Sequence, residues 1–320
     1  MKALRLFAAS FLFLLSFAAS ADPYPTHAIT FIVPYPPGGA TDVVARVIAD
    51  KLSKSLGQTV VVENKGGAGG NLGAHLAAQA KPDGYTFLVG AVTAHSISMT
   101  LTPETAQYNI EKDFAPITMI GSVPLILVVN PSVPAKTLKE FIALAKAKPN
   151  SITVASAGNG TTQHLGLELF KLMTGTEMLH VPYKGSGPAI TDLIGGQVQA
   201  TFETGPAALP QVKGGRLRAL ATATRERMIP DVPTAAEAGL PGFEVAATYG
   251  ILAPAGTPQP IVKRLNSEIG KILKMADVRE KFEQQGVVPM FTTPEQTEAH
   301  IHSEVEKWAK VIKAAHVTAG

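Results

Sequence analysis

Short runs of β-branched residues alternate with helical patterns along most of this chain, and this alternation constrains the fold more than any other feature. A chain of this kind builds mostly parallel sheets covered by helices on both faces. The predicted fold class is therefore α/β. The predicted strands cover residues 29–33, 60–63, 85–89, 125–129, 152–156, 178–181, 198–202, 217–223 and 251–253.

Helices are predicted where apolar residues recur at spacings of three and four. One such pattern occupies residues 43–56 and is closed by Gly57. After Gly256 the alternation stops, and three helices follow with a short strand at 287–291. We expect these helices to pack on one domain; they cover residues 260–275, 277–285 and 294–315.

The chain is long enough for two domains, because about 300 residues exceed the usual size of one core. No low-complexity linker separates two halves, so the boundaries should lie inside structured segments. We expect two strands, at 125–129 and 251–253, to cross between the domains and form a hinge. The predicted first domain comprises residues 22–123 and 248–320, and the second comprises residues 124–247.

The first 21 residues have the pattern of a secretory signal peptide. Lys2 and Arg5 precede an apolar run at 6–17, and the small residues of Ala19-Ser20-Ala21 form a cleavage site. The apolar run is too short for a membrane span, which needs about 20 residues. The mature chain should therefore start near Asp22 and act in the periplasm.

Charge and cysteine content exclude several classes of function. The whole chain carries +3 and the leader holds two basic residues and no acid, which leaves +1 for the mature chain. A nearly neutral chain without basic blocks is a poor candidate for binding nucleic acid. The absence of cysteine excludes disulfides, thiol catalysis and cysteine-bound zinc.

A glycine turn between a predicted strand and a predicted helix is the first candidate ligand site. The amides of a first helical turn lack internal partners and carry the positive end of the helix dipole, so they attract anions. The alternative is an ordinary turn capped by Thr41 or Asp42. Asp42 is assigned a structural role, because a carboxylate would repel an anion. The candidate binding residues here are Pro37, Gly38, Gly39, Ala40 and Thr41.

A second strand–glycine–helix unit lies in the predicted second domain, and two such units facing each other would hold one anion from both sides. For His164, about a turn into the helix, capping or packing is the commoner role. The candidates here are Ser156, Ala157, Gly158, Asn159, Gly160, Thr161 and His164.

Known catalytic patterns are incomplete in this sequence. The dinucleotide fingerprint G-x-G-x-x-G does not occur, and Lys184 stands where a nucleophile elbow around Ser186 needs glycine. His300 and His302 are two residues apart on a helix and point to different sides, so they do not form a metal pair. We therefore predict no enzyme activity, no metal and no cofactor.

Several longer motifs follow one another along the chain: Pro37-Gly38-Gly39, Gln58-Thr59-Val60-Val61-Val62-Glu63-Asn64, Pro82-Asp83-Gly84-Tyr85-Thr86, His180-Val181-Pro182-Tyr183-Lys184-Gly185, Pro230-Asp231-Val232-Pro233-Thr234 and Ala253-Pro254-Ala255-Gly256-Thr257-Pro258. Together they resemble the Bug family, the periplasmic binding components of tripartite tricarboxylate transporters. The resemblance covers essentially the whole mature chain in order. One departure is Tyr249, where relatives often carry tryptophan.

The resemblance implies a type II periplasmic-binding-protein fold with a hinge. It also implies capture of a small carboxylate for delivery to the membrane permease subunits of a tripartite transporter. In that family the two glycine loops hold one ligand carboxylate through backbone groups and ordered waters. We expect a monomer. A ligand-sensing subunit of a signalling system and an enzyme acting on a carboxylate are the alternative functions.

Strand ends beside the two loops should complete the site. Glu203 is interpreted as a solvated loop acid; if it faced the cleft, it would favour a ligand hydroxyl or ammonium over a second carboxylate. For His95 and Tyr183, pocket and packing roles both stay open. These further candidates are Thr93, Ala94, His95, Ser96, Tyr183, Glu203 and Thr204.

Overall fold

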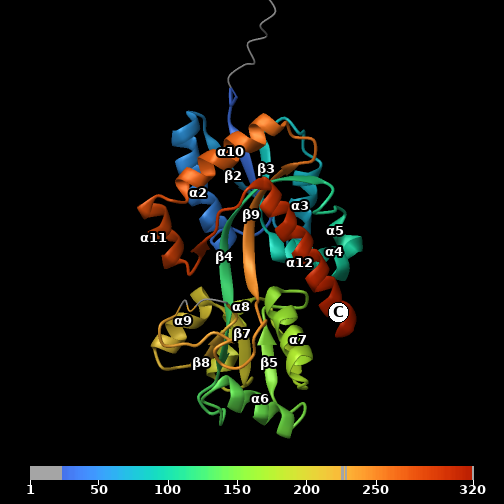
Figure 1. Ribbon diagram of the computed structural model, residues 1–320, viewed down its shortest axis with the longest axis vertical. Helices are drawn as coiled ribbons and strands as arrows, with labels where there is room; N and C mark the ends of the chain where they lie inside the picture. The colour runs from blue at the N-terminus through green and yellow to red at the C-terminus, as the bar shows by residue number, and fades with distance from the viewer. Residues whose placement is uncertain (1–23, 225–226, 228, 319–320) are drawn as a thin grey trace, which may run out of the picture.

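The computed structural model describes residues 24–224, 227 and 229–318. The chain forms two lobes, one above the other in Figure 1, and long strands connect them. The predicted signal peptide lies outside the described residues. Among those that are described, no helix has both the length and the apolar character that crossing a bilayer requires.

The first lobe is built on the parallel strands β1, β2 and β3, with β1 in the centre. Strand β9 joins the sheet antiparallel to β3. The strands are β1 (Ile29–Val33), β2 (Val60–Asn64), β3 (Thr86–Ala91) and β9 (Ala246–Pro254). The helical elements of this lobe are α2 (Ala40–Leu56), η1 (Ala68–Gly70), α3 (Asn71–Ala78), α4 (Val92–Leu101), α5 (Pro103–Ala106), α10 (Gln259–Ile272) and α11 (Ala276–Gln284).

The second lobe repeats this plan with β5 between β6 and β7, all three parallel. Its strands are β5 (Thr153–Ser156), β6 (Leu179–Pro182), β7 (Ala200–Thr204) and β8 (Arg218–Thr222). Its helices are α6 (Leu138–Ala147), α7 (Thr162–Thr174), α8 (Ser186–Ile194) and α9 (Gly205–Lys213).

Strand β4 (Phe114–Val129) belongs to both lobes. It pairs with β9 as far as Pro124, and from Leu125 it pairs with β7 and β8. The short strand β10 (Val288–Pro289) also pairs with β4. The predicted α/β class is confirmed. The sheets are mixed, because the strands that connect the lobes run antiparallel to their neighbours.

Helix α2 shows how local sequence sets an element. Val44, Ile48 and Leu52 recur at spacings of four and are completely buried against the sheet. The helix ends at Gly57, which has φ 70° in the left-handed region that glycine adopts readily. Both the helix and its terminating glycine were predicted from the sequence.

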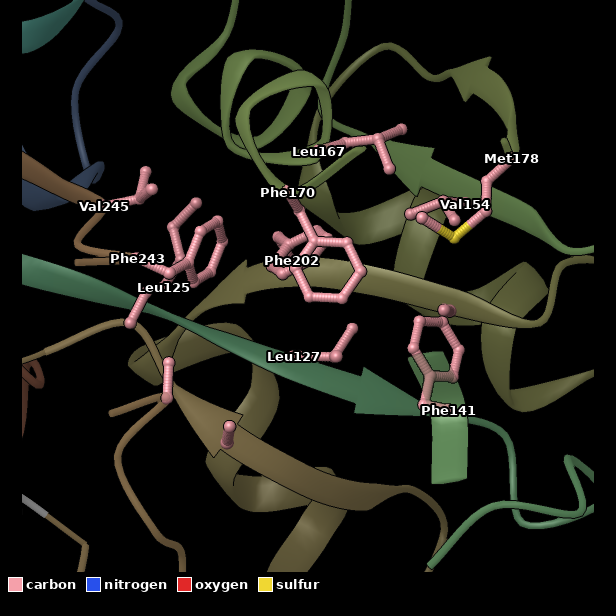
Figure 2. Close-up of a cluster of buried hydrophobic side chains, with 14 of the residues drawn as sticks. Leu125, Leu127, Phe141, Val154, Leu167, Phe170, Met178, Phe202, Phe243 and Val245 are labelled. Atoms are coloured by element: carbon pink, nitrogen blue, oxygen red, sulfur yellow. The ribbon is translucent and has the colours of Figure 1, made fainter. Parts of the chain in front are cut away.

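An aromatic cluster fills the core of the second lobe, with side chains from α6, α7 and β7 (Figure 2). The ring of Phe170 lies 5.2 Å from that of Phe202, and both lie 5.5 Å from Phe243. Such tilted and edge-on pairs add stability beyond area burial. This core supports β5 and β7, whose ends carry part of the site described below.

The C-terminal helix α12 (Pro294–Ala314) departs from the expectation that the last helices cover one domain. It runs down beside the first lobe, next to α4, and its C-terminal end reaches the second lobe (Figure 1). Trp308, Val311 and Ile312 belong to the second-lobe core, where Trp308 is fully buried. The Lys307 ammonium also donates to the Glu244 carbonyl at 2.7 Å. The helix is therefore a further connection between the lobes.

Candidate functional site

A cavity of about 770 Å³ lies between the two lobes. Among the residues that the structure describes, no charged side chain lines this cavity. A Cβ added at Gly160 of the second lobe would lie 2.8 Å from Leu101 of the first, so the lobes meet at one side of the cavity. Its lining includes Tyr35, Pro37, Gly39, Ala40, Thr41, Asn71, Ala94, Leu101, Ala157, Asn159, Gly160, Thr161, Thr162, Gln163, Gly185, Ser186, Thr204 and Tyr249.

Helix N-termini give this uncharged cavity a positive character. The N-cap residues of α2, α4, α7, α8 and α9 all line it: Gly39, Ala91, Thr161, Gly185 and Thr204. Each terminus carries roughly half a positive charge from its helix dipole and has amides without internal partners. The geometry therefore suits a small anion held by backbone groups.

The loop after β1 places the first set of amides. Gly38 has φ 88°, and its N–H donates to the Asp42 carboxylate at 2.9 Å. Burial alone would raise the pKa of Asp42, but hydrogen bonds from Arg46, Gly38 and Asn64 outweigh it and lower the pKa. Asp42 thus has the structural role predicted for it.

The amide of Gly38 is consequently used inside the loop, and Gly38 does not line the cavity. No side chain caps α2. Within the described residues, the N–H groups of Gly39, Ala40 and Thr41 have no hydrogen-bond partner. These three amides are the ones available to an anion from the first lobe.

In the loop after β5, two of the glycine amides predicted to bind the ligand are also used inside the loop. The Gly158 amide donates to Ser156 Oγ and the Gly160 amide to His164 Nδ1, both at 3.1 Å. Gly158 has φ 133° and does not line the cavity. In the part of the chain that the structure describes, the unpaired amides at this helix start belong to Asn159, Thr162 and Gln163.

Ser156 and His164 were both predicted to bind the ligand. Neither lines the cavity, and their side chains instead accept the hydrogen bonds from Gly158 and Gly160 that hold this loop. The rings of His164 and His180 stack with centroids 3.9 Å apart, and His180 Nε2 lies 2.6 Å from Ser156 Oγ. Burial lowers the pKa of each histidine to about 4, and the charge of Lys171 adds to the effect. Both rings are neutral at pH 7, as the acceptor role of His164 requires.

Three of the four candidates after β3 lie away from the cavity lining. These residues form the first turn of α4 and not a strand end, and Ala94 is the one that lines the cavity. Thr93 bonds to Thr248 at 2.9 Å, and His95 Nδ1 lies 2.8 Å from the Tyr108 hydroxyl. Ser96 is fully buried. The helical turn directs these side chains into the core of the first lobe.

The remaining candidates divide in a similar way. Thr204 lines the cavity, whereas the Tyr183 hydroxyl donates to Asp192 at 2.8 Å and Tyr183 is not among the lining residues. Glu203 is completely buried, so its interpretation as a solvated loop acid is wrong. It lies at the end of β7, where the chain turns into α9.

Nine polar or aromatic lining residues were missing from the prediction: Tyr35, Asn71, Ser98, Thr102, Thr105, Thr162, Gln163, Ser186 and Tyr249. Tyr35 and Gln163 belong to the two glycine loops, so the loop positions could have indicated them. Asn71 and Ser186 each follow a glycine at a helix start. For Tyr249, burial raises the pKa of the phenol to about 12, and the hydroxyl remains protonated.

Two α/β lobes joined by long strands, with a cavity between their helix N-termini, are the architecture of the periplasmic binding proteins, and solved structures of that class match this chain. Residues 44–317 match the family described as "Tripartite tricarboxylate transporter family receptor" (TctC). The chain belongs to this family.

The chain is 43% identical to Protein BugT of Bordetella pertussis over 297 residues, which are 92% of this chain and 91% of BugT. Its fold superposes with a TM-score of 0.80 on a Rhodopseudomonas palustris protein solved with adipate. That protein is 37% identical, with 92% of this chain and 99% of the other covered.

The chain is also similar to MatC of Rhodopseudomonas palustris, solved with bound malate. The TM-score is 0.75 and the identity 36%, over 90% of this chain and all of that one. The family and its structural neighbours are solute-binding receptors and not enzymes, as predicted.

Proposed function

We propose that this protein captures a small organic carboxylate between its lobes and delivers it to the permease of a tripartite tricarboxylate transporter. One observation carries the proposal: α2 and α7, from different lobes, begin at one cavity whose described lining has no charged side chain. An anion there meets no cationic side chain, and backbone amides, neutral polar side chains and helix dipoles would hold it, which suits a carboxylate.

The amides assigned to the ligand are those of Gly39, Ala40 and Thr41 in the first lobe and Asn159 and Thr162 in the second. Both sets of residues line the same cavity, and in this proposal one carboxylate accepts hydrogen bonds from both lobes. The relatives solved with adipate and malate support this ligand class. The cavity volume lies within the range of small-molecule sites.

The proposal includes the domain organisation, with boundaries at 123/124 and 247/248 and export to the periplasm by a cleaved leader. Strand β4 changes partners between Pro124 and Leu125, which supports the first boundary. A ligand bridging the lobes would stabilise a closed arrangement by rotation about β4 and β9.

A thermal-shift screen against mono-, di- and tricarboxylates, followed by calorimetry, tests the proposal. A ligand at 100 times its Kd adds about 2.7 kcal/mol of stability, which corresponds to a rise of a few degrees in Tm. Amines and neutral sugars serve as controls. The absence of a shift with every carboxylate, or an equal shift with the controls, contradicts the proposal.

A further inference from the structure

The loop after β5 contains the one Asn-Gly pair of the sequence, at Asn159 and Gly160. Asn159 is exposed and lines the cavity, and within the described residues no hydrogen bond holds its side chain. Asparagine followed by glycine is the pair most prone to lose its side-chain amide, because glycine has no Cβ to hinder attack by its nitrogen. The loop that borders the anion site therefore carries a chemically labile residue.

The reaction needs only these two residues and water. The Gly160 nitrogen attacks Asn159 Cγ, the Cγ–Nδ2 bond breaks, and ammonia leaves with the proton of the Gly160 amide. Water then opens the cyclic imide at either of its carbonyl carbons. Opening at Cγ gives aspartate, and opening at the backbone carbonyl gives isoaspartate, whose main chain is one methylene longer. Either product has a carboxylate in place of the neutral amide.

The structure also provides an acceptor for the proton that must leave. The Gly160 N–H donates to His164 Nδ1 at 3.1 Å, within the reach of a general base. Burial lowers the pKa of His164 to about 4, so this ring nitrogen is unprotonated at pH 7. Gly160 has φ 74°, a conformation that glycine adopts without strain.

A carboxylate at position 159 would change the charge of the cavity. No charged side chain lines the cavity in the part of the chain that the structure describes, and the helix starts give it a positive character. The new charge would lie two residues before Thr161, the N-cap of α7. It would interact with the α7 dipole in place of the ligand and would repel a ligand carboxylate.

We propose that Asn159 is a deamidation site, and that its conversion to aspartate or isoaspartate weakens carboxylate binding. The effect on binding rests on the proposed carboxylate function, whereas the modification does not. Because the reaction needs no enzyme, the binding capacity of the protein decreases with its age.

Mass spectrometry tests the modification. Wild-type protein is kept in mildly alkaline buffer, and its peptides are followed for the gain of about 1 Da that accompanies exchange of an amide for a carboxylate. Asn150 and Asn266, each followed by serine, are controls within the same sample. Asn159 should convert at least tenfold faster than either. Asn159→Gln should suppress the gain at this position, because the longer side chain closes a larger ring more slowly.

Calorimetry with adipate and with malate tests the effect on binding. Ion exchange separates the converted protein by its additional negative charge. This fraction and the Asn159→Asp variant should bind at least tenfold more weakly than the unconverted protein. Asn150→Asp makes the same replacement before β5, at the opposite end of the strand, and should bind like the wild type. The separated fraction gives the answer even where Asn159→Asp does not fold.

The failures are distinguishable. Conversion of Asn159 no faster than that of Asn150 and Asn266 overturns the modification site. Conversion with unchanged affinity of the separated fraction overturns the effect on binding and leaves the proposed function intact. If no carboxylate binds the wild-type protein, the proposed function and the effect on binding fail together, and the mass measurement still decides the modification.

Discussion

Replacing Gly39 with aspartate should weaken ligand binding, because the new carboxylate would accept a hydrogen bond from an amide that otherwise binds the ligand. Gly39 is the N-cap of α2, with φ −77° and ψ 167°, an ordinary extended conformation. A Cβ there would meet only the Pro36 carbonyl at 3.9 Å, so the side chain fits without strain. Aspartate is favoured at an N-cap because its carboxylate accepts from the amides of the first turn. The amide of Thr41, at the second helical position, is one that such a cap can occupy and one that we assign to the ligand.

The magnitude follows from the number of hydrogen bonds lost. A hydrogen bond to a charged group contributes about 1.5–3 kcal/mol, and the new carboxylate would occupy the Thr41 amide and repel the ligand carboxylate. A loss of about 3 kcal/mol raises Kd roughly 150-fold. The variant should also be more stable than the wild type, by a few tenths to about 1 kcal/mol, because α2 gains a cap and a favourable dipole interaction.

Calorimetry with a carboxylate ligand and urea unfolding of the free protein measure these two effects. Gly39→Ala is the matched control, because it adds the Cβ without an acceptor and should bind within threefold of the wild type. The reasoning is refuted if Gly39→Asp and Gly39→Ala bind equally well. A loss of stability in Gly39→Asp would show that the side chain does not cap the helix.

Three further predictions concern stability and export. Trp308→Ala should lower the free energy of unfolding by about 3–5 kcal/mol, since Trp308 is fully buried in the second-lobe core; urea unfolding measures this, and a loss below 1 kcal/mol would contradict that packing. His95, His164 and His180 have pKa values lowered to about 4 from 6.5, so the unfolded chain binds more protons between these values. Stability should therefore fall as pH drops from 6.5 toward 4, by up to roughly 1.4 kcal/mol per pH unit for each histidine; a flat profile in urea melts would show that the rings are not buried as neutral groups. Intact mass of the periplasmic protein should place the mature N-terminus within two residues of Asp22, and retention of Met1 would refute the predicted cleavage.

The sequence by itself determined the class, the order of elements and the location of the two glycine loops. Apolar spacing and a terminating glycine are local signals, so β1 and α2 could be placed from their own residues. Both glycine loops border the cavity, because parallel strands bring the turns after their carboxyl ends to one edge of the sheet. The motifs that resemble the Bug family predicted the same two glycine loops.

Only the tertiary structure decided which groups within those loops are free. The Gly38 amide is taken by Asp42 four residues away, and this depends on a loop geometry that composition does not encode. The burial of Glu203 depends on Gln163, forty residues earlier, and the path of α12 depends on a core formed by the other lobe. Burial and pairing are set by residues distant in sequence, and a local pattern carries no information about such partners.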